Sequence, residues 1–352
     1  MNNMRCLIMI LFLFVLCQDA YMQRSKQDQP VWTYTDFPEY IRQITHFGER
    51  ADWSHDGKKI LFVGRTFGDV YEVETATGKI TPVTHHYYHG GYTRALYLAN
   101  GDILLSGPRQ FNPEAAFEWR RWRCELWVLD KSLKEPPHKL GAYCFEGPSV
   151  SRTKMTIAWT QNYGQEPDPT GRFVIWKADI KYDGGKPYLA DQEIVIDNSH
   201  PKIKGAVLEI QNFRPPDEKE IIFQSTIGVE TYGYNTETGE LTNYSLAPET
   251  HEEPEGIFPD GSYTLVESDR DATIGKWPTN VDFYKLSLDG SGTTQRLSFF
   301  AESGEFRGTN PVISDDGKYI AFQVSPSTAE AGVGIGIFIY DIEEAMNALG
   351  IK

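Results

Sequence analysis

The stretch WSHDGKKILFVG, residues 53–64, recurs near the other end of the chain as ISDDGKYIAFQV, residues 313–324. Both copies contain Ser-x-Asp-Gly-Lys followed by a run of mostly apolar residues. An Asp-Gly pair favours the positive φ that a tight hairpin turn needs, and apolar residues at alternate positions present one strand face to a core. The repeated stretch therefore predicts two strands joined by a hairpin turn.

Four weaker copies of this unit lie between the two clear ones. Each keeps a polar turn followed by an apolar strand, and each is followed by further strand-like residues. The weaker copies are residues 98–107, 150–160, 214–226 and 258–269. A recurring unit of short strands that cannot bury its faces alone is typical of a propeller blade. The sequence predicts an all-β fold, a six-bladed β-propeller with four-stranded blades.

The last unit lacks a fourth strand, because its strand pattern ends at Asp341. The segment YIRQIT, residues 40–45, resembles the fourth strands of other units, such as ITPVT at residues 80–84. We expect this segment to complete the sixth blade from the N-terminal side and so to close the ring. The tail EEAMNALGIK, residues 343–352, is expected to form a short helix on the rim.

The N-terminus predicts export. Arg5 precedes an unbroken apolar run at residues 6–16, which is too short for a transmembrane helix and typical of a signal-peptide core. We expect residues 1–17 to be a signal peptide, 18–36 a linker and 37–352 a single propeller domain. Cys17 follows the apolar run, so plain cleavage and lipid attachment at Cys17 both stay open, as does an uncleaved anchor. The expected location is secreted, periplasmic or outer envelope.

Charge and composition limit the partners. The chain of 352 residues has a net charge of −15, whereas phosphate binding needs a footprint of lysine and arginine. We therefore expect no nucleic-acid partner, and membrane contact only through a lipid on Cys17. An anionic small substrate is compatible with this charge if local arginines hold it. We expect a monomer that binds a glycan or glycoconjugate.

Two cysteines, Cys124 and Cys144, lie outside the predicted signal peptide. In an oxidising compartment two cysteines can pair, and these two flank one predicted hairpin. A disulfide between Cys124 and Cys144 is one expectation, and two separate thiols are the other.

The repeat allows the positions before the innermost strands to be aligned across the six units. Innermost strands line the central channel of a propeller, where a ligand site is expected. Counting back four residues from the aligned turn positions gives Arg50, Arg94, Gly147, Gln211, Pro254 and Asn310. Counting back five gives Glu49, Thr93, Glu146, Ile210, Glu253 and Thr309, with Glu209, Glu255 and Arg307 beside them. This ring is unusually polar for a region next to a core.

The polar ring suggests chemistry on an acidic sugar. Glycoside hydrolysis needs one protonated carboxyl as acid and a second carboxylate as base or nucleophile. The catalytic candidates are Glu146, Glu255, Glu49 and Glu253, with the first two favoured. Arginines suit a uronic-acid carboxylate, because they bind it through paired hydrogen bonds. The substrate-binding candidates are Arg50, Arg94, Tyr92, His89, Gln211, Arg307 and Asn310. A water-filled polar channel without activity is the alternative.

Histidines form a second candidate site in THHYYHGGYTR, residues 84–94. Neutral imidazole is a common metal ligand, so His86 and His89 could share a divalent metal, with His251 or Glu255 as a further ligand. Alternatively, these histidines pack on the rim or stack on sugar beside the neighbouring tyrosines. The acidic stretch at residues 251–256 would then be a solvated loop.

At its repeats the chain resembles the TolB-like propeller superfamily over nearly the whole predicted domain. Further stretches narrow the resemblance, at residues 47–58, 85–102, 251–268, 308–323 and 331–338. They resemble secreted propellers that include the fungal saponin hydrolases, which remove a glucuronosyl-containing sugar chain from a triterpenoid. A more distant resemblance is to oligogalacturonate lyase, a propeller with a histidine-bound metal. The histidine spacing of this chain does not match that enzyme clearly.

These resemblances imply an extracytoplasmic carbohydrate-active enzyme, a glycosidase acting at a uronic acid of a glycan or glycoconjugate. This hydrolase reading requires no cofactor. One alternative is a metal-assisted polysaccharide lyase that uses the loop with His85, His86 and His89. Another is a non-catalytic, TolB-like binding scaffold in the cell envelope. The repeat itself is specific for the fold and carries little information on function.

Overall fold

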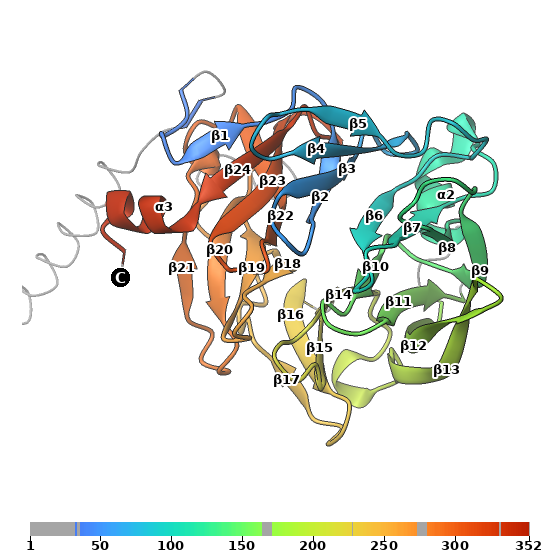
Figure 1. Ribbon diagram of the computed structural model, residues 1–352. Coiled ribbons are helices and arrows are strands. Elements are labelled where there is room, and N and C mark those ends of the chain that lie inside the picture. Colours follow the sequence, from blue (N-terminus) through green and yellow to red (C-terminus); the bar gives the residue numbers. More distant parts are fainter. Residues whose placement is uncertain are drawn as a thin grey trace, which may run out of the picture.

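The computed structural model describes residues 32–33, 36–163, 171–226, 228–272, 280–330 and 332–351. The predicted signal peptide, Cys17 and most of the predicted linker lie outside the described residues. The described chain forms six antiparallel sheets of four strands each, arranged as blades around a common centre (Figure 1). The six-bladed β-propeller predicted from the repeat is confirmed.

In the first three blades, successive strands are neighbours in the sheet. Blade 1 consists of β2 (Glu49–Trp53), β3 (Lys59–Val63), β4 (Val70–Glu74) and β5 (Ile80–Pro82). Blade 2 consists of β6 (Arg94–Tyr97), β7 (Ile103–Gly107), β8 (Glu125–Leu129) and β9 (His138–Tyr143). Blade 3 consists of β10 (Pro148–Val150), β11 (Thr156–Asn162), β12 (Phe173–Asp183) and β13 (Lys186–Asp197).

The remaining blades complete the ring. Blade 4 consists of β14 (Leu208–Phe213), β15 (Glu220–Ser225), β16 (Glu230–Asn235) and β17 (Leu241–Asn243). Blade 5 consists of β18 (Glu252–Ile257), β19 (Tyr263–Ser268), β20 (Asp282–Ser287) and β21 (Thr294–Arg296). Blade 6 consists of β22 (Phe306–Ile313), β23 (Tyr319–Pro326), β24 (Ile337–Asp341) and β1 (Ile41–Gln43). The innermost strands β2, β6, β10, β14, β18 and β22 surround the channel (Figure 1).

Blade 6 combines strands from both ends of the described chain. Strand β1 pairs antiparallel with β24, with Ile41 opposite Tyr340 and Gln43 opposite Phe338. The prediction that residues 40–45 supply the missing fourth strand is therefore confirmed. This pairing joins the two ends of the described chain within one sheet and so closes the ring.

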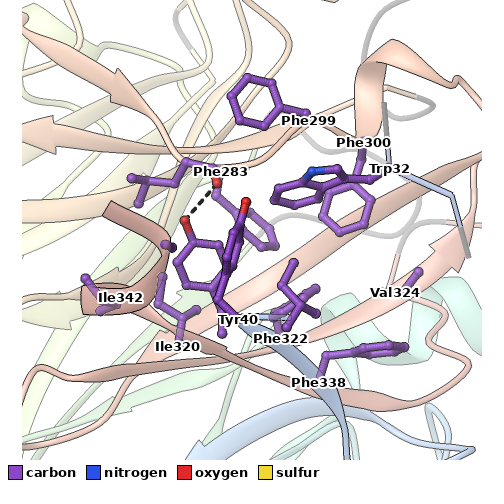
Figure 2. Packing of buried hydrophobic residues seen from close by; sticks show 14 of the residues in the cluster. Trp32, Tyr40, Phe283, Phe299, Phe300, Ile320, Phe322, Val324, Phe338 and Ile342 are labelled. Atoms are coloured by element: carbon purple, nitrogen blue, oxygen red, sulfur yellow. Dashed lines mark hydrogen bonds between the residues drawn. The ribbon is translucent and has the colours of Figure 1, made fainter. Parts of the chain in front are cut away.

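An aromatic cluster stabilises this junction (Figure 2). Trp32 is 2% exposed and meets Phe300 edge to face, with ring centroids 5.1 Å apart. Tyr40 meets Tyr340 at 5.3 Å, and the Tyr340 hydroxyl donates to Leu297 O at 2.9 Å. Edge-to-face pairs are favourable for aromatic rings. Trp32, which lies within the predicted linker, thus belongs to the core around blades 5 and 6.

The two clear repeats fold into the same turn. Ser54 Oγ donates to Asp56 Oδ1 at 2.8 Å, and Gly57 has φ 68°. Ser314 Oγ donates to Asp316 Oδ1 at 2.6 Å, and the glycine that follows has φ 73°. In both turns the serine hydroxyl also accepts the N–H five residues later at 3.0 Å. Serine and aspartate thus satisfy the turn, and glycine provides its left-handed residue.

The described chain also contains short helices outside the six sheets. The predicted C-terminal helix is α3 (Ile342–Leu349), which begins at the Asp341 cap and ends at Gly350 with φ 66°. Blade 2 carries an insertion between β7 and β8 that we did not predict, formed by η1 (Pro113–Ala115) and α2 (Ala116–Trp122). Two further 3-10 turns are η2 (Pro201–Ile203) and η3 (Phe300–Glu302). In the described part of the chain, no helix has the length and apolar character to cross a membrane.

Candidate functional site

A cavity of about 320 Å³ occupies the channel between the blades. All six innermost strands contribute to its wall, from Ala51 of β2 round to Val312 of β22. We call the end at which these strands begin the loop end, and the end at which they run into the hairpin turns the turn end. The predicted polar ring lies at the loop end.

Bulges interrupt four of the innermost strands near the loop end. The pairing register shifts between Glu49 and Asp52 in β2 and between Thr309 and Val312 in β22. It also shifts in β14 at Gln211 and in β18 between Pro254 and Ile257. A bulge re-aims a side chain and is frequent beside active sites. The predicted ring therefore coincides with irregular backbone in blades 1, 4, 5 and 6.

Three ring residues have left-handed backbones, namely Arg50 at φ 54°, Glu146 at φ 59° and Asn310 at φ 51°. Such conformations are strained for residues other than glycine and persist where surrounding contacts enforce them. Arg50 N donates to Gln323 Oε1 at 2.6 Å, and Asn310 N donates to Glu267 Oε1 at 2.5 Å. Each of these bonds joins two neighbouring blades. Contacts between blades thus hold the strained residues in place.

Glu146 is held in its ionised form. Its carboxylate contacts Arg120 Nε at 2.7 Å and Arg121 Nε at 3.3 Å. Burial opposes the charge, but Arg120 and Arg121, with Arg50 and Arg94, lower the pKa of Glu146. Gly147 leaves room for the Arg94 side chain beside Glu146, because a Cβ at position 147 would lie 2.6 Å from Arg94 Cγ.

Glu255 has the opposite behaviour. It is 6% exposed, accepts a hydrogen bond from Asn310 Nδ2 at 2.8 Å and lies 4.0 Å from Arg94 Nη2. Burial raises the pKa of Glu255 to about 7, although Arg94 and the Asn310 bond act against the rise. A glutamic acid with this pKa can donate a proton near neutral pH.

Two more glutamates join this group, the partly buried Glu209 and the buried Glu267. Burial, together with Glu253 and Glu146, raises the pKa of Glu209 well above its usual range. Burial, together with Glu255 and Glu253, raises the pKa of Glu267 likewise. The loop end therefore combines glutamates favoured as neutral acids with one that arginines keep ionised. Divergent pKa values among neighbouring carboxyls are the arrangement that acid–base catalysis uses.

Glu49 and Arg50 contact each other and their surroundings instead of the cavity. Glu49 accepts hydrogen bonds from Thr66 Oγ1 at 2.5 Å and Gly334 N at 3.0 Å. Arg50 Nη1 donates to Thr66 Oγ1 at 2.6 Å and lies 3.4 Å from Glu49. Burial lowers the pKa of Arg50 to about 10. Both side chains join blade 1 to the loop that follows β23, and neither lines the cavity.

Other predicted residues divide between the cavity and its support. Gln211 lines the cavity, and its Nε2 is a buried donor for which the described residues provide no partner. Arg307 is 1% exposed and donates to the backbone carbonyls of Ala329 at 2.7 Å and Glu330 at 2.8 Å. Glu253 lies 2.9 Å from His251 Nε2. Arg307 is thus an anchor for a loop and does not line the cavity.

The predicted metal ligands do not form one cluster. His86 Nε2 contacts Leu133 O at 2.8 Å, and His89 Nε2 contacts Asp69 Oδ1 at 3.0 Å. His89 Nδ1 accepts the Gly91 N–H at 2.9 Å, while His251 lies in blade 5 beside Glu253. Within the described residues, no group of three or more His, Cys, Asp or Glu side chains is arranged to hold a metal ion.

Tyr92 is also separate from the cavity. It is 3% exposed, belongs to the core between blades 1 and 2, and stacks on His89 with centroids 4.9 Å apart. His89 and Tyr92, both predicted to bind substrate, therefore pack against each other. His85 contacts the ring of His86 at 5.4 Å.

Cys124 and Cys144 are both buried free thiols, so of the two expectations the structure agrees with separate thiols and not with the disulfide. The two residues are neighbours, because Cys144 N donates to Cys124 O at 2.9 Å. Their sulfur atoms have different partners, which explains the difference. Cys124 Sγ contacts Thr93 Oγ1 at 3.8 Å, whereas Cys144 Sγ contacts Phe145 O at 3.7 Å.

The sequence analysis missed Arg120, Arg121 and Glu267. The first two lie on α2, and the 3-10 helix η1 just before it carries a recognisable signal, since Asn112 caps η1, proline follows and Glu114 is in its first turn. Glu267 lies in β19 among residues that are buried on both faces. A glutamate within such a strand is unusual and is a signal of a polar site.

Comparisons with known proteins show the fold. No protein-family model and no curated protein matches this chain. Among solved structures, TolB from Acinetobacter baumannii has a TM-score of 0.52 at 13% identity, covering 82% of this chain and 65% of TolB. An oligogalacturonate lyase in complex with manganese has 0.52 at 12% identity, covering 87% of this chain and 79% of the lyase.

A gluconolactonase from Xanthomonas campestris has a TM-score of 0.50 at 11% identity, covering 86% of this chain and 88% of that chain. This chain thus spans just under two thirds of TolB and larger shares of the two enzymes. At such low identity the likeness concerns the fold alone, since one fold hosts many functions. The chain has the same propeller fold as TolB and these two enzymes.

Proposed function

We propose that the protein is an extracytoplasmic glycoside hydrolase that acts at a uronic acid of a glycan or glycoconjugate. The observation that carries the proposal is the pair of glutamates with opposite pKa shifts at the loop end. The pKa of Glu255 is raised to about 7 and that of Glu146 is lowered. Arg94 and Arg50 influence both pKa values, so the two carboxyls share one electrostatic environment.

The two glutamates would have different roles. Below about pH 7, Glu255 carries a proton that it donates to the glycosidic oxygen as the bond to the leaving sugar breaks. Ionised Glu146 stabilises the positive charge that develops at the anomeric carbon. Water then supplies its hydroxyl to that carbon and its proton to the Glu255 carboxylate, which restores the acid, so the products are a free sugar and a free alcohol.

Arg94 and Gln211 support an acidic substrate. Both line the cavity, and Arg94 Nη2 lies 4.0 Å from the carboxylate of Glu255. A guanidinium with such a distant partner can bind a uronate carboxylate through paired hydrogen bonds. The unpartnered Nε2 of Gln211 can donate to a sugar hydroxyl. The resemblance to glucuronosyl-cleaving propellers agrees with this substrate class.

The proposed location rests on the N-terminal residues. The apolar run at residues 6–16 and its preceding charge are typical of a signal peptide, which carries a protein out of the cytoplasm. Detection of the protein in the culture medium or envelope fraction, with its N-terminus sequenced, would test this part of the proposal.

The direct test is an activity screen on uronic-acid oligosaccharides and glucuronosides, run with and without EDTA. We expect turnover that survives EDTA and is lost in Glu146→Gln. Glu237→Gln is the matched control, because Glu237 is exposed and its partner is the surface residue Lys219. This control should retain full activity.

Two other outcomes would overturn the hydrolase. Turnover that is lost with EDTA and yields an unsaturated product absorbing in the ultraviolet would establish a metal-assisted lyase. Binding of the same glycans without turnover, unchanged in Glu146→Gln, would establish a binding scaffold.

A further inference from the structure

The two ends of the channel cavity differ in their exposure to solvent. Three residues of its wall are exposed, and all three lie at the turn end, namely Thr153, Pro216 and Pro259. The wall residues at the loop end, such as Glu209 and Glu255, are buried or mostly buried. The described part of the cavity wall therefore reaches solvent at the turn end.

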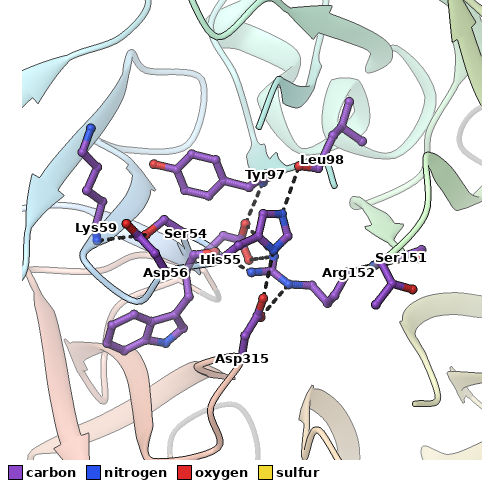
Figure 3. A network of polar contacts seen from close by, with 12 residues as sticks. Ser54, His55, Asp56, Lys59, Tyr97, Leu98, Ser151, Arg152 and Asp315 are labelled. Carbon is purple, nitrogen blue, oxygen red and sulfur yellow. Dashed lines mark hydrogen bonds and ion pairs between the residues drawn. The ribbon is translucent and has the colours of Figure 1, made fainter. Parts of the chain in front are cut away.

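One side of the turn end is crossed by Arg152 (Figure 3). Arg152 comes from blade 3, and its Nε donates to Asp315 Oδ1 of blade 6 at 2.8 Å. Its Nη2 donates to Trp53 O of blade 1 at 2.7 Å. Blades 3 and 6 lie opposite each other in the ring, so this side chain spans the channel. The other side of the turn end, at blades 4 and 5, is not crossed by Arg152. Pro216 and Pro259 lie on this side, where a ligand can enter.

Neighbouring contacts make the Arg152 crossing rigid. His55 Nδ1 contacts Asp315 Oδ2 at 2.9 Å, and His55 Nε2 contacts Leu98 O at 3.0 Å. Asp52 Oδ2 accepts the Tyr97 N–H at 2.7 Å and its carboxylate lies 3.3 Å from Arg152 Nη1. The group joins blades 1, 2, 3 and 6, as Figure 3 shows for its labelled members.

At the loop end, polar side chains bond one another between blades. Glu146 of the segment before β10 is fixed to Arg120 and Arg121 of the insertion in blade 2. Glu255 of blade 5 is bonded to Asn310 of blade 6. A polymer passing right through the channel would have to break these contacts, whereas a chain end entering from the turn end would stop at them.

We infer that substrate enters the cavity at the turn end, beside Arg152, and that the site accepts the end of a glycan chain. This inference rests on the proposed hydrolase, because it assigns the route to the same carboxyls. The terminal sugar lies deepest, next to Glu255 and Arg94, and the rest of the chain extends out between Thr153, Pro216 and Pro259. A volume of about 320 Å³ is at the small end of the range of ~300–1,000 Å³ usual for ligand pockets, which suits a short terminal segment.

The route is tested by blocking each end in turn. Thr153→Cys carries a single accessible thiol when Cys6 and Cys17 are replaced by serine, because Cys124 and Cys144 are buried. Gln110→Cys, exposed in the loop after β7, is the matched control. Attachment of a bulky maleimide should lower kcat/KM at least tenfold at Thr153→Cys and less than twofold at Gln110→Cys. The reverse pattern, or no effect at either position, would overturn the route.

The chain-end preference is tested with a uronide hexamer labelled at one end. We expect labelled products that shorten stepwise from one terminus, and a bulky cap on that terminus should abolish cleavage. Early appearance of labelled fragments of all lengths would refute the chain-end preference while leaving the hydrolase intact. If the enzyme without attached maleimide cleaves no uronide at all, the proposed function is refuted, and this inference is refuted with it.

Discussion

The two ends of the channel are built from the same strands but carry different kinds of residues. At the turn end, the two clear repeats hold the same residues, such as Ser54 and Ser314, with their hydrogen bonds satisfied within the turn. At the loop end, equivalent positions hold residues as different as Arg50, Gly147 and Gln211. Repetition at one end secures the fold, while divergence at the other creates a unique group of charges. The difference indicates where function resides in a repeat protein.

Among the variants that test the difference between the two ends, Glu255→Gln should have the largest effect, which is on activity. Glu255→Gln keeps the size and the acceptor for Asn310 but has no proton to donate, so kcat should fall by about 10²–10⁴. In the parent enzyme the rate should fall as pH rises above about 7, because Glu255 loses its proton there. Measured kcat across pH 4–9 on a uronide substrate checks both. An unchanged rate would move the acid to another residue.

Removing Arg152 should have the next largest effect, and on stability. Arg152→Met leaves Asp52 without its cation and Asp315 with His55 alone, and breaking a buried pair from one side costs about 3–5 kcal/mol. Because the Arg152 side chain is a quarter exposed, we expect the lower value in urea unfolding. Asp52→Asn in the same chain should restore part of the loss. Equal free energies of unfolding for the parent and Arg152→Met would show that the contacts of Arg152 do not stabilise the fold.

Asn310→Gly separates strain from chemistry at the loop end. Glycine accepts φ 51° without strain, so the backbone should stay in place. The Asn310 bond favours the charged form of Glu255, and its loss should raise the pKa of Glu255 further. The descending limb of the pH profile should therefore move to higher pH. A shift to lower pH would contradict the contact between Asn310 and Glu255.

His55 should give the smallest effect. Its hydrogen bond with Asp315 raises the pKa of His55, so this contact stabilises the folded state fully below pH ~6.5. That contribution disappears as pH rises through the folded-state pKa. His55→Gln should lose about 0.5–1 kcal/mol at low pH and almost nothing at high pH, judged by unfolding at several pH values. If the difference in unfolding free energy between the parent and His55→Gln is the same at every pH, His55 stabilises the fold through packing and not through its charge.

The repeat predicted the blades and their closure, because turns and alternation are local properties. Ser-x-Asp-Gly at residues 54–57 and 314–317 specifies its hairpin through bonds within a few residues. The closing strand at residues 40–45 was identifiable by its likeness to other fourth strands. These features do not depend on what lies opposite them in the ring.

The site was predicted less completely. The repeat count named Glu146, Glu253 and Glu255 together, but only Glu255 of these three lines the described cavity wall. A bulge in β18 adds residues to one strand and moves side chains relative to a regular count. Arg120 lies on an inserted helix outside the repeat, so no alignment of repeats could have placed it near Glu146.

The sequence by itself determined that the chain forms six blades, where their turns lie and how the ring closes. Only the tertiary structure decided which polar side chains meet in the channel, which of their pKa values rise and fall, and at which end the cavity reaches solvent. The physical reason is the sequence distance over which each kind of interaction acts. Turns and strands depend on neighbours along the chain, whereas burial and the field at Glu255 depend on Arg94 and Asn310, which come from other blades.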